Sequence, residues 1–530
     1  MKCNFSILII PLFFLFYTCK KEKKPTSWQS DIVTPLANAK FTLNNFLNDE
    51  YLTGDSNGVV HVVFKHDFYD LPLDSLGKIP DTTLIESLSI PFSINAPPGY
   101  IFYSNAQTIK LNASPLELSY AEIEKGFIDI TIESNVPEKI IVTYNVPGAK
   151  KNNQSLNLVD TVPAAQGAKA IFKKTLNIQG YTLDLTGPNQ NSYNKLAVNF
   201  YAQLNPQASQ NIPLSSSTLF KITTNYRDIS PSYIKGYFGK ETFKLGPDTA
   251  IFDQFSSYVS GALNLEKVKM LLRFNNQFGV DAVLKINGLT AINTKNGQTV
   301  NLSNNIIGQA IQLTRAIETG QTPPVYSVPK EYILDQNNSN IDQFFEIMPN
   351  RLVYDLELKV NPMGNISSGN DFLYKNYPFQ SYFELDIPMS LTAQDLVLSD
   401  TIDLKINENI EWIDWLNGKI YLYAENFFPS DFEVSIQLFD TNKTATSLIN
   451  NQGKINAAVT DGSGLAQTPV KSVMVLSLDD KQMQDFYHAG YLAFVLKLNT
   501  ANYSSFVKFT QNNYLDLKLI HEAQVKYFIR

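Results

Sequence analysis

The sequence contains almost no cysteine. Among its 530 residues there are two, Cys3 and Cys19. The chain beyond Cys19 therefore forms no disulfide bond, and it offers no thiol for nucleophilic catalysis and no cysteine ligand for a metal ion. Exported proteins often use disulfides, but a chain of this length can be stabilised by burial of apolar surface alone.

An excess of charge of one sign is also absent. The chain carries 43 Lys and Arg residues against 50 Asp and Glu residues, a net charge of −7. Proteins that bind nucleic acid present a basic surface, so this composition argues against a nucleic-acid partner. The mildly acidic balance does not point to any particular partner.

A long hydrophobic run is missing too. The apolar stretch 5–17 is shorter than the roughly 18 residues that a membrane-spanning helix needs, and Pro11 interrupts it. Lys2 precedes this stretch and Thr18 and Cys19 follow it, which is the anatomy of an export signal. We expect Cys19 to be the first mature residue, with diacylglycerol on its thiol and an acyl group on its amine, because several acyl chains anchor a protein stably. The alternative is an ordinary signal peptide cut nearby.

The four residues Phe16, Tyr17, Thr18 and Cys19 resemble the lipobox of bacterial lipoproteins, which reads Leu, Ala or Ser, Gly or Ala, and Cys. Phe16 and Tyr17 are bulkier than the residues that the lipobox has at the same positions. Residues 20–27 are a short polar tether with four lysines. In lipoproteins of the Bacteroidota an acidic stretch at this place marks transfer to the cell surface, so the basic tether favours the periplasmic face of the outer membrane. The alternative is a solvated tether near anionic head groups.

Aromatic residues are abundant, with 34 Phe and 27 Tyr, and they favour strands. Several apolar stretches alternate with period two, as in 128–133, where the isoleucines share one face. Short helices are expected at 248–259, 339–349 and 480–488, the second with a capping box at Ser339. The fold class is therefore mainly β, with tandem antiparallel β-sandwich domains and a few short connecting helices. Strands are expected at 59–64, 126–133, 139–145, 195–204, 351–360, 381–387 and 491–498.

The length allows two to four domains, because domains usually have about 100–200 residues. The predicted division follows the signal, the turn-rich stretches and the strands. It comprises a signal peptide at 1–18, a lipidated tether at 19–30, a first β-sandwich region at 31–235, a second β region at 236–390 and a third at 391–530.

One pattern occurs three times. An alternating strand runs into an asparagine, then a turn with Pro or Gly, then a second alternating strand. The asparagines are Asn135, Asn276 and Asn426, and in the last two copies the apolar face resumes six residues later, at Ala282 and Phe432. Asparagine bonds its own main chain, and Pro or Gly interrupts the strand ladder. The spacing predicts three related β units; the alternative is a common strand corner in an Asn-rich chain.

Four segments together resemble a group of large, uncharacterised outer-membrane lipoproteins of the Bacteroidota. They are 35–51, the 339–345 segment before Pro349, the strand end 360–362 and the corner 426–429. The resemblance covers most of the chain, and it implies an all-β fold at the outer membrane but no activity. The corner is also similar, over short segments, to the strand kink of type-2 late-embryogenesis-abundant domains.

The same resemblance implies O-glycosylation. Exported proteins of that group carry glycans on Ser or Thr after Asp, with a small or aliphatic residue next. Five such positions stand in turn-like segments of this chain, which makes modification the expected outcome. They are Ser75, Thr82, Thr161, Thr249 and Thr401.

No catalytic constellation stands out. His61 and His66 lie five apart in a strand-like segment and so face opposite sides, and neither has a metal-ligand spacing with His488 or His521. No metal or cofactor is expected. Acid/base catalysis by two paired carboxylates is still an open alternative, because a sequence does not show which carboxylates lie close together in space.

One aromatic group could bind sugar rings. Trp412, Trp415, Tyr421 and Tyr423 lie close together in the sequence, and aromatic faces stack on the apolar side of sugars. The alternative, that they fill the interface between two sheets, is the commoner use of such residues.

The function expected from these features is that of an outer-membrane lipoprotein without enzyme activity. It would be anchored to the membrane by lipid and would serve as a binding or structural subunit of an envelope protein complex. The alternative is a ligand-binding lipoprotein that holds glycan or lipid in a cleft between sheets. A glycan-cleaving enzyme would need two carboxylates about 5–10 Å apart across a groove.

Overall fold

The computed structural model describes residues 27–71, 79–88, 90–255, 257–404, 413–450, 453–500 and 505–528. Within these ranges the chain forms two compact units. Unit 1 comprises 27–46, 257–261 and residues from 392 onward, and unit 2 comprises 47–255 and 262–391. Most described residues are in antiparallel strands, and two short α-helices are present, α2 (Ile341–Glu346) and α3 (Asp480–Tyr487). The predicted mainly β fold with few helices is confirmed.

One eight-stranded sandwich occurs three times among the residues that the structure describes. With its strands numbered one to eight in chain order, each copy has two antiparallel layers, ordered 6-3-8-1 and 5-4-7-2. In two copies the layers are separate sheets, and in the third the short strand 182–184 joins them. Two such sheets packed face to face form a jelly roll. Side chains that alternate along each strand fill the space between the sheets.

The three copies are numbered I to III in the order of their first strands along the chain. Sandwich I belongs to unit 1, apart from the first two residues of its second strand, and sandwiches II and III belong to unit 2. Sandwich I consists of β1 (Ser27–Phe41), β27 (Ser390–Asp403), β28 (Ile413–Asn426), β29 (Asp431–Phe439), β30 (Ala445–Ile449), β33 (Val470–Leu478), β34 (Tyr491–Asn499) and β36 (Leu515–Phe528). Sandwich II consists of β3 (Val60–Leu71), β15 (Glu241–Ile251), β17 (Lys269–Asn275), β18 (Ala282–Ile292), β20 (Ala310–Leu313), β23 (Lys330–Leu334), β24 (Arg351–Val360) and β26 (Phe379–Pro388). Sandwich III consists of β4 (Thr82–Ser87), β6 (Ile101–Lys110), β7 (Glu117–Ser134), β8 (Ile140–Lys151), β9 (Gln154–Val162), β10 (Ala170–Asn177), β12 (Lys195–Leu204) and β14 (Phe220–Tyr237).

The remaining elements are short connections. They are η1 (Leu43–Asn45), η2 (Asp49–Tyr51), β2 (Leu52–Gly54), β5 (Ile94–Ala96), β11 (Thr182–Asp184), β13 (Ile212–Leu214), β16 (Tyr258–Leu265), β19 (Thr299–Asn301), β21 (Ile317–Glu318), β22 (Val325–Tyr326), β25 (Asp371–Tyr374), β31 (Val459–Thr460), β32 (Ala466–Thr468) and β35 (Val507–Lys508). In the described part of the chain no helix is long and apolar enough to span a bilayer.

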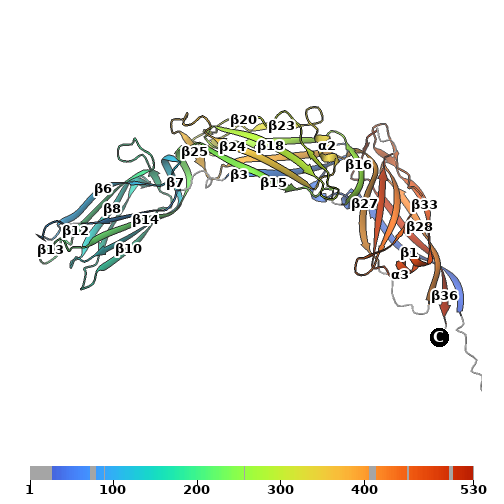
Figure 1. Cartoon of the computed structure of the whole chain (residues 1–530), viewed down its shortest axis with the longest axis horizontal. Coiled ribbons are helices and arrows are strands. Elements are labelled where there is room, and N and C mark those ends of the chain that lie inside the picture. Colours follow the sequence, from blue (N-terminus) through green and yellow to red (C-terminus); the bar gives the residue numbers. More distant parts are fainter. Residues whose placement is uncertain are drawn as a thin grey trace, which may run out of the picture. The chain divides into compact units, whose positions relative to one another are not determined.

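The sandwiches are nested in the sequence. All of sandwich III lies between the first and second strands of sandwich II, and all of sandwich II lies between the first and second strands of sandwich I. As a result β1 pairs with β36 from Ser27 opposite Phe528 to Phe41 opposite Leu515, and Figure 1 shows the blue first strand beside the red last one. The predicted boundaries at 235 and 390 stay predictions; the structure adds that residues 27–46 share a unit with the C-terminal strands.

Aromatic side chains join the two sheets of each sandwich. In sandwich I the rings of Phe41 and Phe494 lie 5.4 Å apart, edge to face. In sandwich II the ring of Phe68 lies 5.0 Å from that of Tyr354. In sandwich III the buried hydroxyl groups of Tyr144 and Tyr226 are hydrogen-bonded to each other. Buried aromatic pairs of this kind supply much of the apolar area that stabilises a sandwich.

The third strand of each sandwich passes to the fourth through one repeated corner. In sandwich I the corner is built on Asn426, whose side chain is fully buried. Its Nδ2 donates to the carbonyl oxygens of Ser430 at 2.8 Å and Asn456 at 2.9 Å, and its Oδ1 accepts from the N–H of Phe428 at 2.9 Å. The buried ring of Phe428 closes the corner.

Sandwich II repeats this corner at Asn276, which is 2% exposed. Its Nδ2 donates to the carbonyls of Val280 at 3.0 Å and Thr314 at 3.2 Å, and its Oδ1 accepts from the N–H of Phe278 at 3.2 Å. As at Asn426, the amide donates to the carbonyl four residues later and accepts from the N–H two residues later, while its second carbonyl partner lies 38 residues later here and 30 residues later in sandwich I. The two corners are therefore copies of one structure.

Sandwich III has the corner one residue earlier than the sequence predicted. The buried hydroxyl of Ser134 accepts from the N–H of Val136 at 3.1 Å, and buried Val136 takes the place of the phenylalanine. Asn135 is exposed and bonds to Ser217 and Leu219 instead. The prediction that Asn135 is the first copy was wrong, because a serine hydroxyl makes the same turn bond as an asparagine amide.

With Ser134 as the counterpart, all three copies share one register. The next strand buries the sixth residue after the corner residue in each case, at Ile140, Ala282 and Phe432. The carbonyl two residues after the corner residue accepts an alanine N–H in each case, from Ala165 at 2.9 Å, Ala316 at 2.8 Å and Ala458 at 2.9 Å. The predicted repetition of a β unit therefore has a common structural basis.

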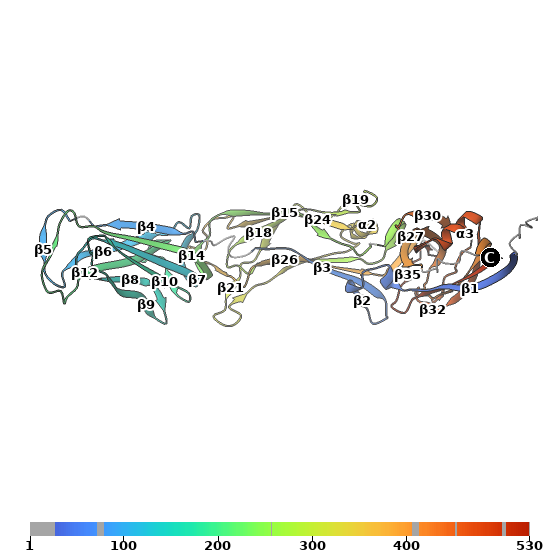
Figure 2. The ribbon, with the colours of Figure 1, turned by 90° about the horizontal axis from the view of Figure 1, so that it is seen from below.

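The helix predictions had mixed outcomes. The helices expected at 339–349 and 480–488 are present as α2 and α3, and Figure 2 shows α3 close to β30. The capping box expected at Ser339 is absent, since the N-cap of α2 is Asn340 and makes no side-chain cap bond. The helix expected at 248–259 was wrong: β15 continues to Ile251 and β16 begins at Tyr258.

Candidate functional site

An apolar patch lies on the outer side of one sheet of sandwich I. Ile420 and Leu422 face the core, so Tyr421 and Tyr423 face outward. On the neighbouring edge strand β33, Val475 lies opposite Tyr421 and Val473 opposite Tyr423, and on β36 Ile520 lies opposite Tyr421. We call Tyr421, Tyr423, Val473, Val475 and Ile520 the tyrosine face.

Three residues of the tyrosine face are exposed, Tyr421 and Ile520 are half-buried, and the ring of Tyr421 is held in place by a hydrogen bond. Tyr423 is 41% exposed, Val473 59% and Val475 50%. The hydroxyl of Tyr421 donates to Oε2 of Glu522 on β36 at 2.6 Å, which fixes its ring across the sheet. This hydrogen bond to a carboxylate raises the pKa of Tyr421 above its ordinary value.

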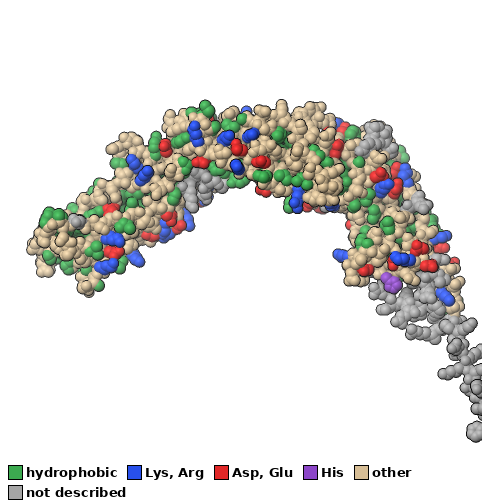
Figure 3. Space-filling view, in the orientation of Figure 1, with side chains coloured by type: hydrophobic (Ala, Val, Ile, Leu, Met, Phe, Trp, Pro, Cys, Tyr) green, Lys and Arg blue, Asp and Glu red, His purple; other side chains and the backbone are tan. Residues whose placement is uncertain are grey.

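Charged groups of both signs border the tyrosine face. Glu425 accepts a hydrogen bond from the Tyr514 hydroxyl at 2.6 Å and forms an ion pair with Lys471 at 3.4 Å. Lys518 lies opposite Tyr423 on β36 and is exposed. Figure 3 shows basic and acidic side chains intermingled on the surface that it displays. An apolar centre with a mixed polar rim is typical of protein-binding surfaces.

Only part of the predicted aromatic platform can be placed. Trp412 lies outside the described residues, and Trp415 is in β28 but its side chain is not described. Tyr421 and Tyr423 share one outward face. The alternative that these two tyrosines fill the space between the sheets is not what the structure shows. Sequence reasoning missed Val473, Val475 and Ile520, because strand pairing brings them from distant positions.

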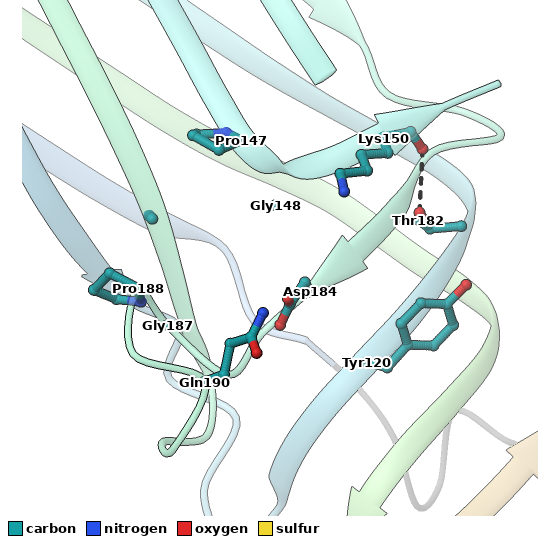
Figure 4. Close-up of a pocket in the computed structure, with 10 residues that line it drawn as sticks. Tyr120, Pro147, Gly148, Lys150, Thr182, Asp184, Gly187, Pro188 and Gln190 are labelled. Atoms are coloured by element: carbon teal, nitrogen blue, oxygen red, sulfur yellow. Dashed lines mark hydrogen bonds between the residues drawn. The ribbon is translucent and has the colours of Figure 1, made fainter. Parts of the chain in front are cut away.

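A polar hollow of about 430 Å³ lies in sandwich III (Figure 4). Lys150 at the end of β8, Asp184 at the end of β11 and Gln190 in the following loop extend into it, and Tyr120 of β7 forms one side. Gly148 lets β8 approach β11 closely, because a Cβ there would lie 2.9 Å from the Asp184 carbonyl oxygen.

The groups in this hollow can both donate and accept hydrogen bonds. The Asp184 carboxylate accepts from the N–H of Thr186 at 3.0 Å and from its hydroxyl at 2.5 Å, so its position is fixed. The Thr182 hydroxyl donates to the Lys150 carbonyl at 3.2 Å, which holds β11 to β8. An ammonium, an amide and a carboxylate around one hollow suit a ligand rich in hydroxyl groups.

The predicted glycosylation sites differ in exposure. Thr161, Thr249 and Thr401 are exposed, and in each case Oδ1 of the preceding aspartate accepts the threonine N–H, at 2.8, 2.7 and 2.9 Å. Thr82 is 7% exposed, and its hydroxyl donates to the Pro80 carbonyl at 3.4 Å, so a transferase cannot reach it in the folded chain. Ser75 lies outside the described residues. Modification stays a prediction.

The remaining predicted groups add no site. Cys19, the predicted lipid-anchored residue, lies outside the described residues. His61 contacts Asp386 at 2.6 Å, whereas the ring of His66 packs among Phe64, Tyr354 and Phe383. Across the described ranges no group of three or more His, Cys, Asp or Glu side chains is arranged to hold a metal ion.

Comparison with known proteins found similarity only among solved structures. No family model matches the chain, and no curated protein matches it. The chain is similar to a structure from Parabacteroides distasonis described as a candidate secreted protein, with 11% identity over 93% of this chain and 99% of that one and a TM-score of 0.29. It is also similar to the VP2 subviral particle of infectious bursal disease virus, with 8% identity over 87% and 83% of the two chains and a TM-score of 0.11.

Proposed function

We propose that the protein is a lipid-anchored subunit of an outer-membrane protein complex and that it binds a partner protein through the tyrosine face. It has no catalytic role in this proposal. The lipid on Cys19 holds it at the periplasmic side of the outer membrane. Residues 20–26 join the anchor to β1 and span at most about 25 Å, so sandwich I works close to the lipid surface.

The tyrosine face is the observation that carries the proposal. Tyrosine is among the side chains that contribute most to protein binding, because it buries a large ring at little cost in conformational entropy. Here two tyrosines stand on adjacent outward positions of a central strand, and Val473 and Val475 extend the apolar area to the sheet edge. A partner that covers them removes exposed apolar surface from water, and the charged rim can set its orientation.

The substitution Tyr423→Lys tests the proposal. A charge at the centre of the face must be buried on binding, so we expect at least about tenfold less partner to co-purify with the tagged protein from detergent-solubilised outer membrane. The matched control is Tyr326→Lys, at a tyrosine that is 58% exposed in unit 2. A protein that always elutes alone, or equal recovery of partner with both variants, would refute the proposal.

A second candidate function, binding of a glycan, is favoured by the polar hollow of sandwich III. If sugar hydroxyl groups bond to Lys150 and Gln190, then Lys150→Ala and Gln190→Ala should each weaken binding about fivefold or more, at about 1 kcal/mol for each hydrogen bond. Calorimetric titration with a panel of mono- and disaccharides measures this. Lys173→Ala, at an exposed lysine of β10 in the same sandwich, is the control. Absence of any saccharide binding to the wild-type protein would exclude this function.

A further inference from the structure

The three sandwiches allow one strand to be compared in three copies. The sixth strands, β10, β23 and β33, each pair with the third strand of their sandwich and, in the described ranges, with no other strand. They are therefore sheet edges. The outer N–H and C=O groups of an edge strand can pair with another chain, and proteins usually protect such edges with charged residues or by making them short.

Two of the three edges are protected in this way. In sandwich III, β10 carries Lys173 and Lys174 at its centre, and Lys174 forms an ion pair with Asp160 at 3.1 Å. In sandwich II, β23 has five residues, begins with Lys330 and Glu331, and Glu331 forms an ion pair with Arg273.

The edge of sandwich I lacks this protection. The strand β33 has nine residues, Val-Lys-Ser-Val-Met-Val-Leu-Ser-Leu, and its one charge, Lys471, stands next to its first residue. Met474, Leu476 and Leu478 are buried, while Val473 and Val475 point outward and are at least half exposed. A long, apolar edge with a single charge near one end is a surface for strand addition.

We infer that β33 pairs antiparallel with β33 of a second copy of this chain, about a two-fold axis at Met474. This register places Val473 opposite Val475 of the second copy and Lys471 opposite Ser477 of the second copy. No like charges meet, and apolar side chains face each other on both sides of the joined sheet, which is the self-complementarity that a two-fold interface requires. A two-fold pairing about the centre of β10 would instead put Lys173 opposite Lys174 of the other copy, and the two like charges would repel each other.

The pairing extends the tyrosine face. Because Val473 and Val475 belong to that face, joining two copies at β33 makes one continuous outer surface that carries four tyrosines. The partner proposed above would then meet a two-fold face. This use of the dimer rests on the proposed function, but the strand pairing does not, since it needs no other protein.

Cysteine cross-linking tests the pairing and its register. With Cys19→Ser, the chain beyond the signal has no cysteine, so Val473→Cys and Val475→Cys each supply one. Residues directly opposite in an antiparallel pair bring their Cβ atoms to about 5 Å, close to the separation that a disulfide bridges. We expect an equal mixture of the two variants to give cross-linked dimers from about half of the molecules, and each variant alone to give almost none.

Other results would overturn the inference. Cross-linking of either variant alone would refute the register, and its absence in the mixture would refute the pairing. Sedimentation of the Cys19→Ser protein gives a second measurement that requires no engineered thiol. A dimer that Val475→Lys converts to monomer supports the inference, whereas a monomer at about 50 µM contradicts it. If the pairing fails while Tyr423→Lys still abolishes partner recovery, only the dimer is lost.

Discussion

The substitution Asn426→Ala should lower the free energy of unfolding of unit 1 by about 3 kcal/mol. It removes three buried hydrogen bonds, each worth about 1 kcal/mol net, and takes from the carbonyls of Ser430 and Asn456 the amide donor that Asn426 supplies. Guanidinium unfolding of the full-length protein measures the loss. Tryptophan fluorescence reports on the right unit, because all three tryptophans, Trp28, Trp412 and Trp415, fall in the sequence of unit 1.

The control for this prediction is Asn442→Ala, at an exposed asparagine of the same unit. It should change stability by less than about 0.5 kcal/mol. In unit 2, Asn276→Ala should destabilise more than Asn135→Ala, as followed by hydrogen exchange, because Asn276 loses three buried hydrogen bonds and the exposed Asn135 loses two that water can replace. Equal effects at Asn276 and Asn135 would contradict the assignment of the corner in sandwich III.

Unit 1 should also lose about 3 kcal/mol of stability between pH 7 and pH 4 because of His521. This side chain is 1% exposed, and its ring lies against Phe486 and bonds to the hydroxyl of Tyr487. Burial lowers the pKa of His521 to about 4, from the ordinary value of 6.5. A difference of one unit corresponds to about 1.4 kcal/mol, which gives the size of the effect.

The direction follows from proton binding. Between pH 6.5 and pH 4 the unfolded chain binds a proton at His521 and the folded chain does not, so acid favours unfolding. Carboxylates whose pKa is lowered, such as Asp461 and Asp485, add a loss of their own at lower pH. The variant His521→Phe separates the two, because it cannot titrate. The free energy of unfolding of this variant should fall by about 3 kcal/mol less than that of the wild type between pH 7 and pH 4. Equal losses in the variant and the wild type would show that His521 is not the cause.

The strands were largely predictable because their signal is local. Residues 195–204 and 351–360 were predicted as strands and coincide with β12 and β24. In both, every second side chain is buried, and this alternation is visible in the sequence. The corners at Asn276 and Asn426 were visible for the same reason, since the turn bonds involve residues close in the chain.

Features that depend on distant pairing were not predictable. The strand β1 contains Pro35 and several polar residues, and it is a strand because β36 supplies its ladder from the other end of the sequence. The segment 248–251 has helix-like signals, yet its backbone pairs with β24, so tertiary contacts override the local preference. The nesting of the sandwiches follows from such pairings and leaves no local trace.

The candidate site divides in the same way. Tyr421 and Tyr423 were identified because they are neighbours in one strand, and the packing alternative looked stronger because a sequence does not tell which face of the strand meets the core. Val473 and Val475 join them only through the ladder between β28 and β33. The hollow around Lys150, Asp184 and Gln190 likewise needs three separate segments, and no motif marks it.

Partner recovery from the outer membrane tests the central claim most directly. Tagged wild-type protein, Tyr423→Lys and Tyr326→Lys are purified in parallel from detergent-solubilised outer membrane, and Cys19→Ser shows whether the anchor is needed to reach it. We expect a common partner with the wild type and Tyr326→Lys, at least about tenfold less of it with Tyr423→Lys, and loss of Cys19→Ser from the membrane fraction. Full partner recovery with Tyr423→Lys, or a Cys19→Ser protein that stays in the membrane, would contradict it.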